Sequence, residues 1–305
     1  MANVDMAVAD VWQREVGELS NRKFTHRLAA SQDLVLRLDV SKKLEKNYVK
    51  TLTFESGHGD LCTGFRAKIM PYTDDRSLIT CGGDGQVRHA QILECSVETR
   101  LLAKHQRNAS DLAFEPGSPH LIYTCGEDGL VQHIDLRTAA AAELIRCQPI
   151  GGCSVRNPVI PLYAIAIDPR NPNVFAFVGS DQYAHLYDIR KYKCGGSIDF
   201  GRLIDCFYPP HVIANTNCTF GPKCLAFSDQ SELLVSYRDN SIYLFTHDMG
   251  LGHNPVPSSP SSSCSEANGK AIPQVYKGHG KKERVDCLSF FGPKSEFVVS
   301  GSENG

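Results

Sequence analysis

The chain has 305 residues, a formal net charge of −2 and 42% hydrophobic residues, an ordinary composition for a globular protein with a sizeable core. The near-neutral charge argues against non-specific nucleic-acid binding, which requires a basic surface. No apolar run reaches the ~18 residues of a membrane-spanning helix, and the first residues carry no secretory signal. The sequence therefore predicts a protein of the nucleus or the cytoplasm, with neither a membrane nor nucleic acid as a partner.

Twelve cysteines are present, but they include no Cys-x-x-Cys pair and no cysteine–histidine group with the spacing of a zinc site. Most of them lie in apolar, strand-like segments, where cysteine acts as a small hydrophobic residue. We therefore expect reduced, mostly buried thiols, and neither a metal nor a cofactor.

Residues 1–46 differ from the rest of the chain. Val8, Val11, Trp12, Val16 and Leu19 follow the spacing of one face of a helix, which predicts an amphipathic helical segment. Such a helix either packs on the rim of the following domain or is offered to a groove on a partner. The sequence leaves both alternatives open.

From residue 80 onward, a turn pattern with an acidic residue recurs along the chain. Two copies are complete, Gly82-Gly83-Asp84-Gly85 and Gly126-Glu127-Asp128-Gly129, and degenerate copies follow at Asp181, Asp239 and Glu303. Glycine after the acid supplies the positive φ that tight hairpin turns require. The copies recur at intervals of roughly 40 to 65 residues, the period of β-propeller blades. Residues 47–305 are therefore predicted to form an all-β propeller.

Apolar runs around these turns predict the strands of each repeat, which turn-forming residues separate. We expect four-stranded antiparallel sheets, and the sequence locates three strands in each of three repeats. These are 111–114, 121–125 and 130–134, then 163–167, 174–178 and 184–187, then 224–227, 232–236 and 242–245.

The repeats resemble WD repeats, in which a Gly-His dipeptide precedes the turn aspartate and Trp-Asp ends the third strand. His58, His105 and His279 each precede the acid of a turn by roughly 25 residues. The resemblance implies a histidine–aspartate hydrogen bond inside the blade, so we assign these residues a structural rather than a catalytic role. The structural turn acids are Asp84, Asp128, Asp181 and Asp239. The family tryptophan is replaced by Ala90, Ile134, Tyr187 and Phe245.

Two predicted third strands end in Ile134-Asp135-Leu136-Arg137 and Tyr187-Asp188-Ile189-Arg190. Apart from the tryptophan, both match the Trp-Asp-x-Arg box of substrate receptors of cullin-4 RING ubiquitin ligases. The resemblance implies that Asp135, Arg137, Asp188 and Arg190 contact the ligase adaptor, and arginine suits such a contact because its guanidinium binds oxygen acceptors in a fixed fork. The alternative is a local salt bridge at each strand end, which would contribute little.

Along essentially its whole length, the chain resembles the cullin-4-associated factor 8 type of WD-repeat receptor in a plant-like form, as in Tyr276-Lys277-Gly278-His279 and residues 291–302. The resemblance implies a seven-bladed propeller that docks on DNA-damage-binding protein 1, and through it on cullin-4, and presents proteins for ubiquitylation. The chain departs from this pattern where residues 47–54 stand in place of a first blade, and at its end. We therefore expect an incomplete propeller of about four to five blades.

A Ser/Pro-rich segment at 254–270 is predicted to be a disordered loop. The sequence shows no nucleophile elbow, phosphate-binding loop or metal-ligand set, so no catalytic residue is assigned. The favoured function is a non-enzymatic substrate receptor. The alternative is a WD-repeat scaffold for another intracellular assembly, and recovery of the adaptor in a pull-down discriminates between them.

Overall fold

The computed structural model describes residues 66–73, 76–93, 97–138, 140–147, 159–191, 203–209, 221–238, 241–252, 272–278, 285–292 and 294–302. In these ranges the only helices are two 3-10 turns, η1 (Ile189–Lys191) and η2 (His247–Met249). Neither has the length or the apolar character to cross a membrane. The predicted helical segment 1–46, the loop 254–270, His58, Asp239 and His279 lie outside the described residues.

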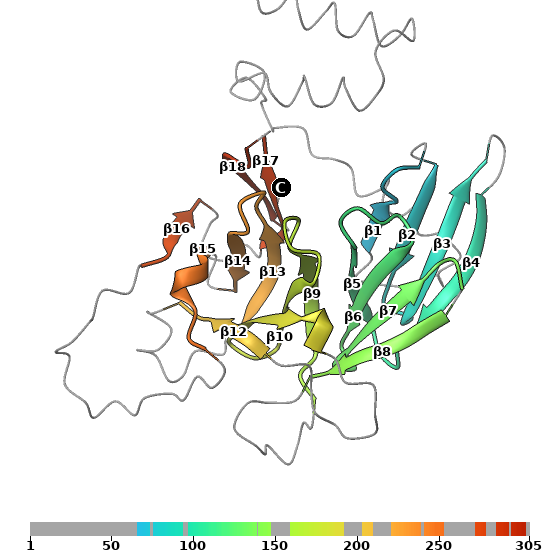
Figure 1. Ribbon diagram of the computed structural model, residues 1–305, viewed down its shortest axis with the longest axis horizontal. Coiled ribbons are helices and arrows are strands. Elements are labelled where there is room, and N and C mark those ends of the chain that lie inside the picture. Colours follow the sequence, from blue (N-terminus) through green and yellow to red (C-terminus); the bar gives the residue numbers. More distant parts are fainter. Residues whose placement is uncertain are drawn as a thin grey trace, which may run out of the picture.

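The strands of the described residues form four four-stranded sheets and one two-stranded sheet, all antiparallel and each in chain order (Figure 1). The first sheet comprises β1 (Arg66–Ile69), β2 (Ser77–Cys81), β3 (Gln86–Ile92) and β4 (Val97–Lys104), and the second comprises β5 (Ala109–Phe114), β6 (Leu121–Gly126), β7 (Leu130–Asp135) and β8 (Ala140–Arg146). The third comprises β9 (Leu162–Ile167), β10 (Val174–Gly179), β11 (Ala184–Asp188) and β12 (Leu203–Phe207). The fourth comprises β13 (Pro222–Phe227), β14 (Leu233–Tyr237), β15 (Ser241–Phe245) and β16 (Gln274–Lys277), and the last sheet pairs β17 (Val285–Phe291) with β18 (Phe297–Ser302).

The first strands of the sheets lie toward the middle of the molecule, and β4, β8 and β16 lie toward its outside (Figure 1). Strand β9 packs against both β5 and β13, and β13 also packs against β17. Between the second and third sheets, the amide of Ile165 donates to Asp111 Oδ2 at 3.2 Å. This all-β arrangement of successive four-stranded sheets is consistent with a WD-repeat propeller.

The turns between second and third strands have the geometry that the sequence predicts. Asp84 Oδ1 accepts the amide of Gln86 at 3.0 Å, and Asp128 Oδ1 accepts the amide of Leu130 at 3.2 Å. Gly85 has φ 75° and Gly129 has φ 74°, a backbone conformation that residues with a Cβ adopt at a cost. Glycine therefore allows each reversal to be tight.

Apolar clusters fill the spaces between the sheets. Tyr123, Phe175 and Phe177 pack together between the second and third sheets, and Val235 and Phe245 belong to the cluster between the third and fourth. All four residues that replace the family tryptophan are at most 9% exposed: Ala90, Ile134, Tyr187 and Phe245. Full burial of a large apolar side chain contributes about 1.5–3 kcal/mol, so packing stabilises the sheets at these positions.

The described cysteines largely follow the prediction of buried thiols. Cys125, Cys147 and Cys206 are buried and reduced, and burial raises the pKa of Cys206 to about 12. Cys287 differs, because it is exposed and its sulfur accepts a hydrogen bond from Arg66 Nη1 at 3.0 Å. The protonated thiols of the interior therefore act as packing groups.

Candidate partner-binding face

The two Asp-x-Arg boxes lie at equivalent positions of neighbouring sheets. Asp135 is the last residue of β7, and Asp188 is the last residue of β11. In the register of the sheets, Asp135 lies opposite Leu121 and Asp188 opposite Val174, each the first residue of the adjacent second strand. The fold therefore places both boxes at the same end of the strands in two neighbouring sheets. We call the surface formed by these strand ends the Asp-x-Arg edge.

The residue between the acid and the arginine turns toward the core in both boxes. Leu136 and Ile189 are partly buried against the clusters that flank the second sheet. By contrast, the side chains of Arg137 and Arg190 are each 63% exposed. This alternation fixes each box to the core by its central residue and directs the arginine outward.

In the first box, Arg137 binds Asp135 through a bidentate fork. Its Nε donates to Asp135 Oδ1 at 3.0 Å, and its Nη2 donates to Oδ2 at 2.8 Å. The amide of Arg137 donates to Oδ1 as well, at 3.0 Å. These hydrogen bonds lower the pKa of Asp135 to about 2, so the pair stays ionised and intact at neutral pH.

The second box repeats this geometry. Arg190 Nε donates to Asp188 Oδ1 at 3.1 Å, and Nη2 donates to Oδ2 at 2.9 Å. The side chain of Asp188 is only 6% exposed, so this carboxylate anchors a guanidinium that reaches solvent. Hydrogen bonding to its aspartate raises the pKa of Arg190, as it does that of Arg137.

Each fork uses two of the five N–H donors of its guanidinium. Within the described part of the chain, no other group accepts a hydrogen bond from Arg137 or Arg190. The sequence left open a local salt bridge or a partner contact, and the salt bridge is present. The salt bridge leaves the other N–H donors of the guanidinium available for a partner, because it holds the group in one orientation with these donors exposed. A preoriented group loses less entropy on binding.

The opposite edge carries buried polar networks. His105 Nδ1 lies 3.0 Å from Asp128 Oδ1, and its Nε2 lies 3.0 Å from Thr124 Oγ1. The histidine–aspartate hydrogen bond that the WD resemblance implies is thus present in this sheet. Burial alone would raise the pKa of Asp128, but hydrogen bonds from His105 and from the amides of Gln106 and Leu130 outweigh it and lower the pKa. The side chains of His105 and Asp128 are 0% and 4% exposed, which suits a structural role.

The third sheet contains a histidine contact that the sequence interpretation missed. His185 Nε2 lies 2.5 Å from Asp181 Oδ2 in the turn before β11, and His185 Nδ1 lies 3.7 Å from Cys206 Sγ. Here the histidine follows the turn acid along the third strand, whereas the family pattern places it before the acid. The sequence signal that could have identified this contact is a histidine four residues after a turn acid.

Comparisons with known proteins also indicate a WD repeat. Residues 271–305 match the family described as "WD domain, G-beta repeat". Over 201 residues, or 63% of this chain, it is 30% identical to mouse and 29% identical to human "DDB1- and CUL4-associated factor 6". It is 26% identical over 144 residues, or 47% of the chain, to mouse "WD and tetratricopeptide repeats protein 1".

The chain spans 22% of the length of both factor 6 relatives and 20% of the third. It therefore contains a WD40 repeat and is distantly similar to a protein whose name associates it with DDB1 and CUL4.

Proposed function

We propose that this chain is a non-enzymatic substrate receptor of a cullin-4 RING ubiquitin ligase, which docks on the adaptor DNA-damage-binding protein 1. The observation that carries the proposal is the repeated fork: two exposed arginines, each held by its own aspartate, at equivalent positions of neighbouring sheets. The similarity to DDB1- and CUL4-associated factor 6 supports it.

The chemistry of the Asp-x-Arg edge suits recognition of a protein surface. A guanidinium binds a carboxylate or a backbone carbonyl through parallel N–H donors, which gives orientation as well as attraction. Two such groups in successive sheets engage one partner surface in a single register. The assignment to the factor 8 type, the nuclear or cytoplasmic location and the recruitment of proteins for ubiquitylation are parts of the same proposal.

The direct test is binding of the purified chain to the purified adaptor, measured by biolayer interferometry. We expect saturable binding of one adaptor per chain. Circular dichroism dominated by strand signal is the control that the chain is folded. A folded chain that does not bind the adaptor would contradict the proposal and favour the scaffold alternative.

A further inference from the structure

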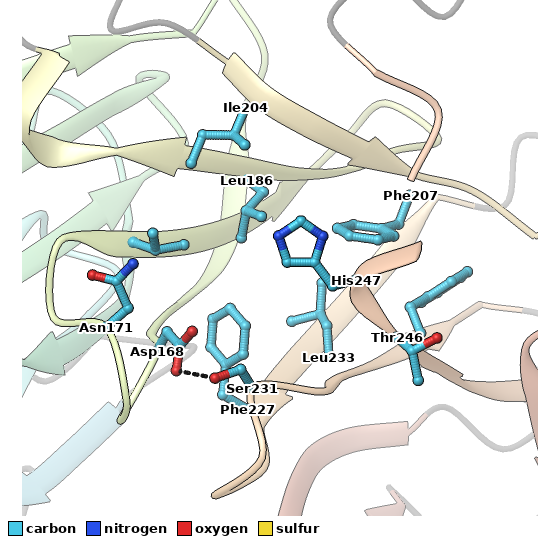
Figure 2. Close-up of a pocket in the computed structure, with 12 residues that line it drawn as sticks. Asp168, Asn171, Leu186, Ile204, Phe207, Phe227, Ser231, Leu233, Thr246 and His247 are labelled. Carbon is cyan, nitrogen blue, oxygen red and sulfur yellow. Dashed lines mark hydrogen bonds between the residues drawn. The ribbon is translucent and has the colours of Figure 1, made fainter. Parts of the chain in front are cut away.

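A cavity of about 90 Å³ lies between the third and fourth sheets. Its wall is mostly apolar and includes Leu186, Phe207, Phe227 and Leu233, which Figure 2 shows together with the ring of His247. Val174 also lines the cavity and lies opposite Asp188 in the register of the third sheet. The cavity therefore adjoins the Asp-x-Arg edge at its second box.

A buried carboxylate borders this apolar space. Asp168 is 6% exposed, and its Oδ1 accepts a hydrogen bond from the amide of Arg170 at 2.9 Å. The same oxygen accepts one from Ser231 Oγ at 2.9 Å, which Figure 2 marks with a dashed line. Among the described residues, no group donates to Oδ2, and none of the salt bridges includes Asp168. Oδ2 is not among the fully enclosed side-chain atoms without a partner in the described residues, so it keeps some contact with solvent, and Asp168 lines the cavity.

The nearest arginine in sequence does not neutralise this carboxylate. Arg170 Nε donates instead to the backbone oxygen of Asp229, in the turn after β13. The cavity thus combines a mostly apolar wall, which also includes Asn171, Thr246 and His247, with one carboxylate oxygen to which no described group donates a hydrogen bond. The carboxylate is hydrogen-bonded through Oδ1 alone. Because a buried charge that is incompletely paired is costly, an occupant that supplies a cation is favoured over a purely apolar one.

We propose that the cavity binds the side chain of a lysine or an arginine presented by a segment of a partner protein. These residues have an apolar stem with a cation at its tip. The stem would contact the aliphatic wall, and the cation would meet Asp168 Oδ2. The rings of Phe207 and Phe227 add attraction for a cation. The inference goes beyond the proposed function, because it specifies a contact that neither Asp-x-Arg box makes and that does not require the adaptor.

Small probes test this inference on the full chain without any partner. n-Butylammonium and n-butylguanidinium carry the stem and the charge, and n-butanol carries a stem of the same length without the charge. Methyl NMR is recorded on Leu186, Ile204 and Leu233, which line the cavity. We expect both cations to shift these methyl signals saturably and n-butanol to bind about tenfold more weakly or worse, since a charge-assisted contact is lost.

Two variants separate the carboxylate from the fold. Asp168→Asn keeps an oxygen that can accept from Arg170 and Ser231 but removes the charge, so it should weaken binding of the cations about tenfold. Asp229→Asn removes an exposed carboxylate on the neighbouring turn and should leave binding unchanged. Thermal melts confirm that both variants fold. Equal binding of n-butanol and the cations, undiminished binding by Asp168→Asn, or no shift of the cavity methyls with any probe would each overturn the inference.

Discussion

Replacement of Arg137 and Arg190 together by alanine is expected to abolish adaptor binding while leaving the fold intact. Loss of a guanidinium from a buried, hydrogen-bonded interface pair lowers affinity by roughly 30-fold or more per arginine. In the free chain both side chains are 63% exposed and pair only within their own box among the described residues. Such pairs contribute little to stability, so the thermal melt should stay within a few degrees of that of the original chain.

The matched control is Arg146→Ala. Arg146 is 42% exposed on the outer strand β8 and lies 3.6 Å from Glu143, so its removal deletes an exposed, paired arginine away from the Asp-x-Arg edge. Biolayer interferometry should show unchanged adaptor affinity for this control. If the double variant binds as the original chain does, both boxes are local strand-end salt bridges, and the scaffold function takes precedence.

Asp128→Ala is expected to destabilise the fold strongly. The carboxylate of Asp128 accepts hydrogen bonds from His105, from the amide of Gln106 at 2.8 Å and from the amide of Leu130. Each buried donor that loses its acceptor costs about 1–3 kcal/mol, and the costs are not fully additive. We therefore expect a decrease of about 3–5 kcal/mol in the free energy of unfolding, measured by urea denaturation.

The neighbouring Glu127→Ala is the control, because Glu127 is partly exposed and its side chain makes no hydrogen bond or ion pair among the described residues. It should change stability by less than about 0.5 kcal/mol.

The lowered pKa of Asp128 also predicts how the stability of the fold depends on pH. Its stabilisation is complete above the unfolded carboxyl pKa of about 4 and is lost as the pH falls below that value. The original chain should therefore lose more stability between pH 5 and 3 than Asp128→Ala does; equal losses would contradict this role.

The predicted strands agree with the structure to within two residues in all three repeats for which they were assigned. They could be predicted because buried strands carry continuous apolar runs that turn residues interrupt. The fourth strands β4, β8, β12 and β16 were not located. In β8 the residues Ala140–Glu143 are exposed and favour a helix on intrinsic propensity. They form a strand because pairing with β7 outweighs that preference.

For the candidate site, too, the sequence predicts some features and not others. The position of each Asp-x-Arg box at a strand end could be predicted from the local sequence, but the fork between Asp135 and Arg137 depends on side-chain geometry. The cavity could not be predicted, because its lining comes from separate segments: Asp168 follows β9, Leu186 lies in β11 and Ser231 precedes β14. Only tertiary packing brings such residues together. The residues that replace the family tryptophan could be recognised from their spacing after the turn acids, and the fold preserves that spacing.

Hydrogen–deuterium exchange of the chain with and without the adaptor tests the central claim most directly. The turn at residues 127–130 and the box at Asp135–Arg137 lie at opposite ends of strand β7, roughly 20 Å apart at about 3.3 Å per residue. We predict slower exchange at 135–138 and 188–190 on adaptor binding, with no change at the turns 83–86 and 127–130. Protection confined to those turns, or no protection at either box under saturating adaptor, would contradict docking through the Asp-x-Arg edge.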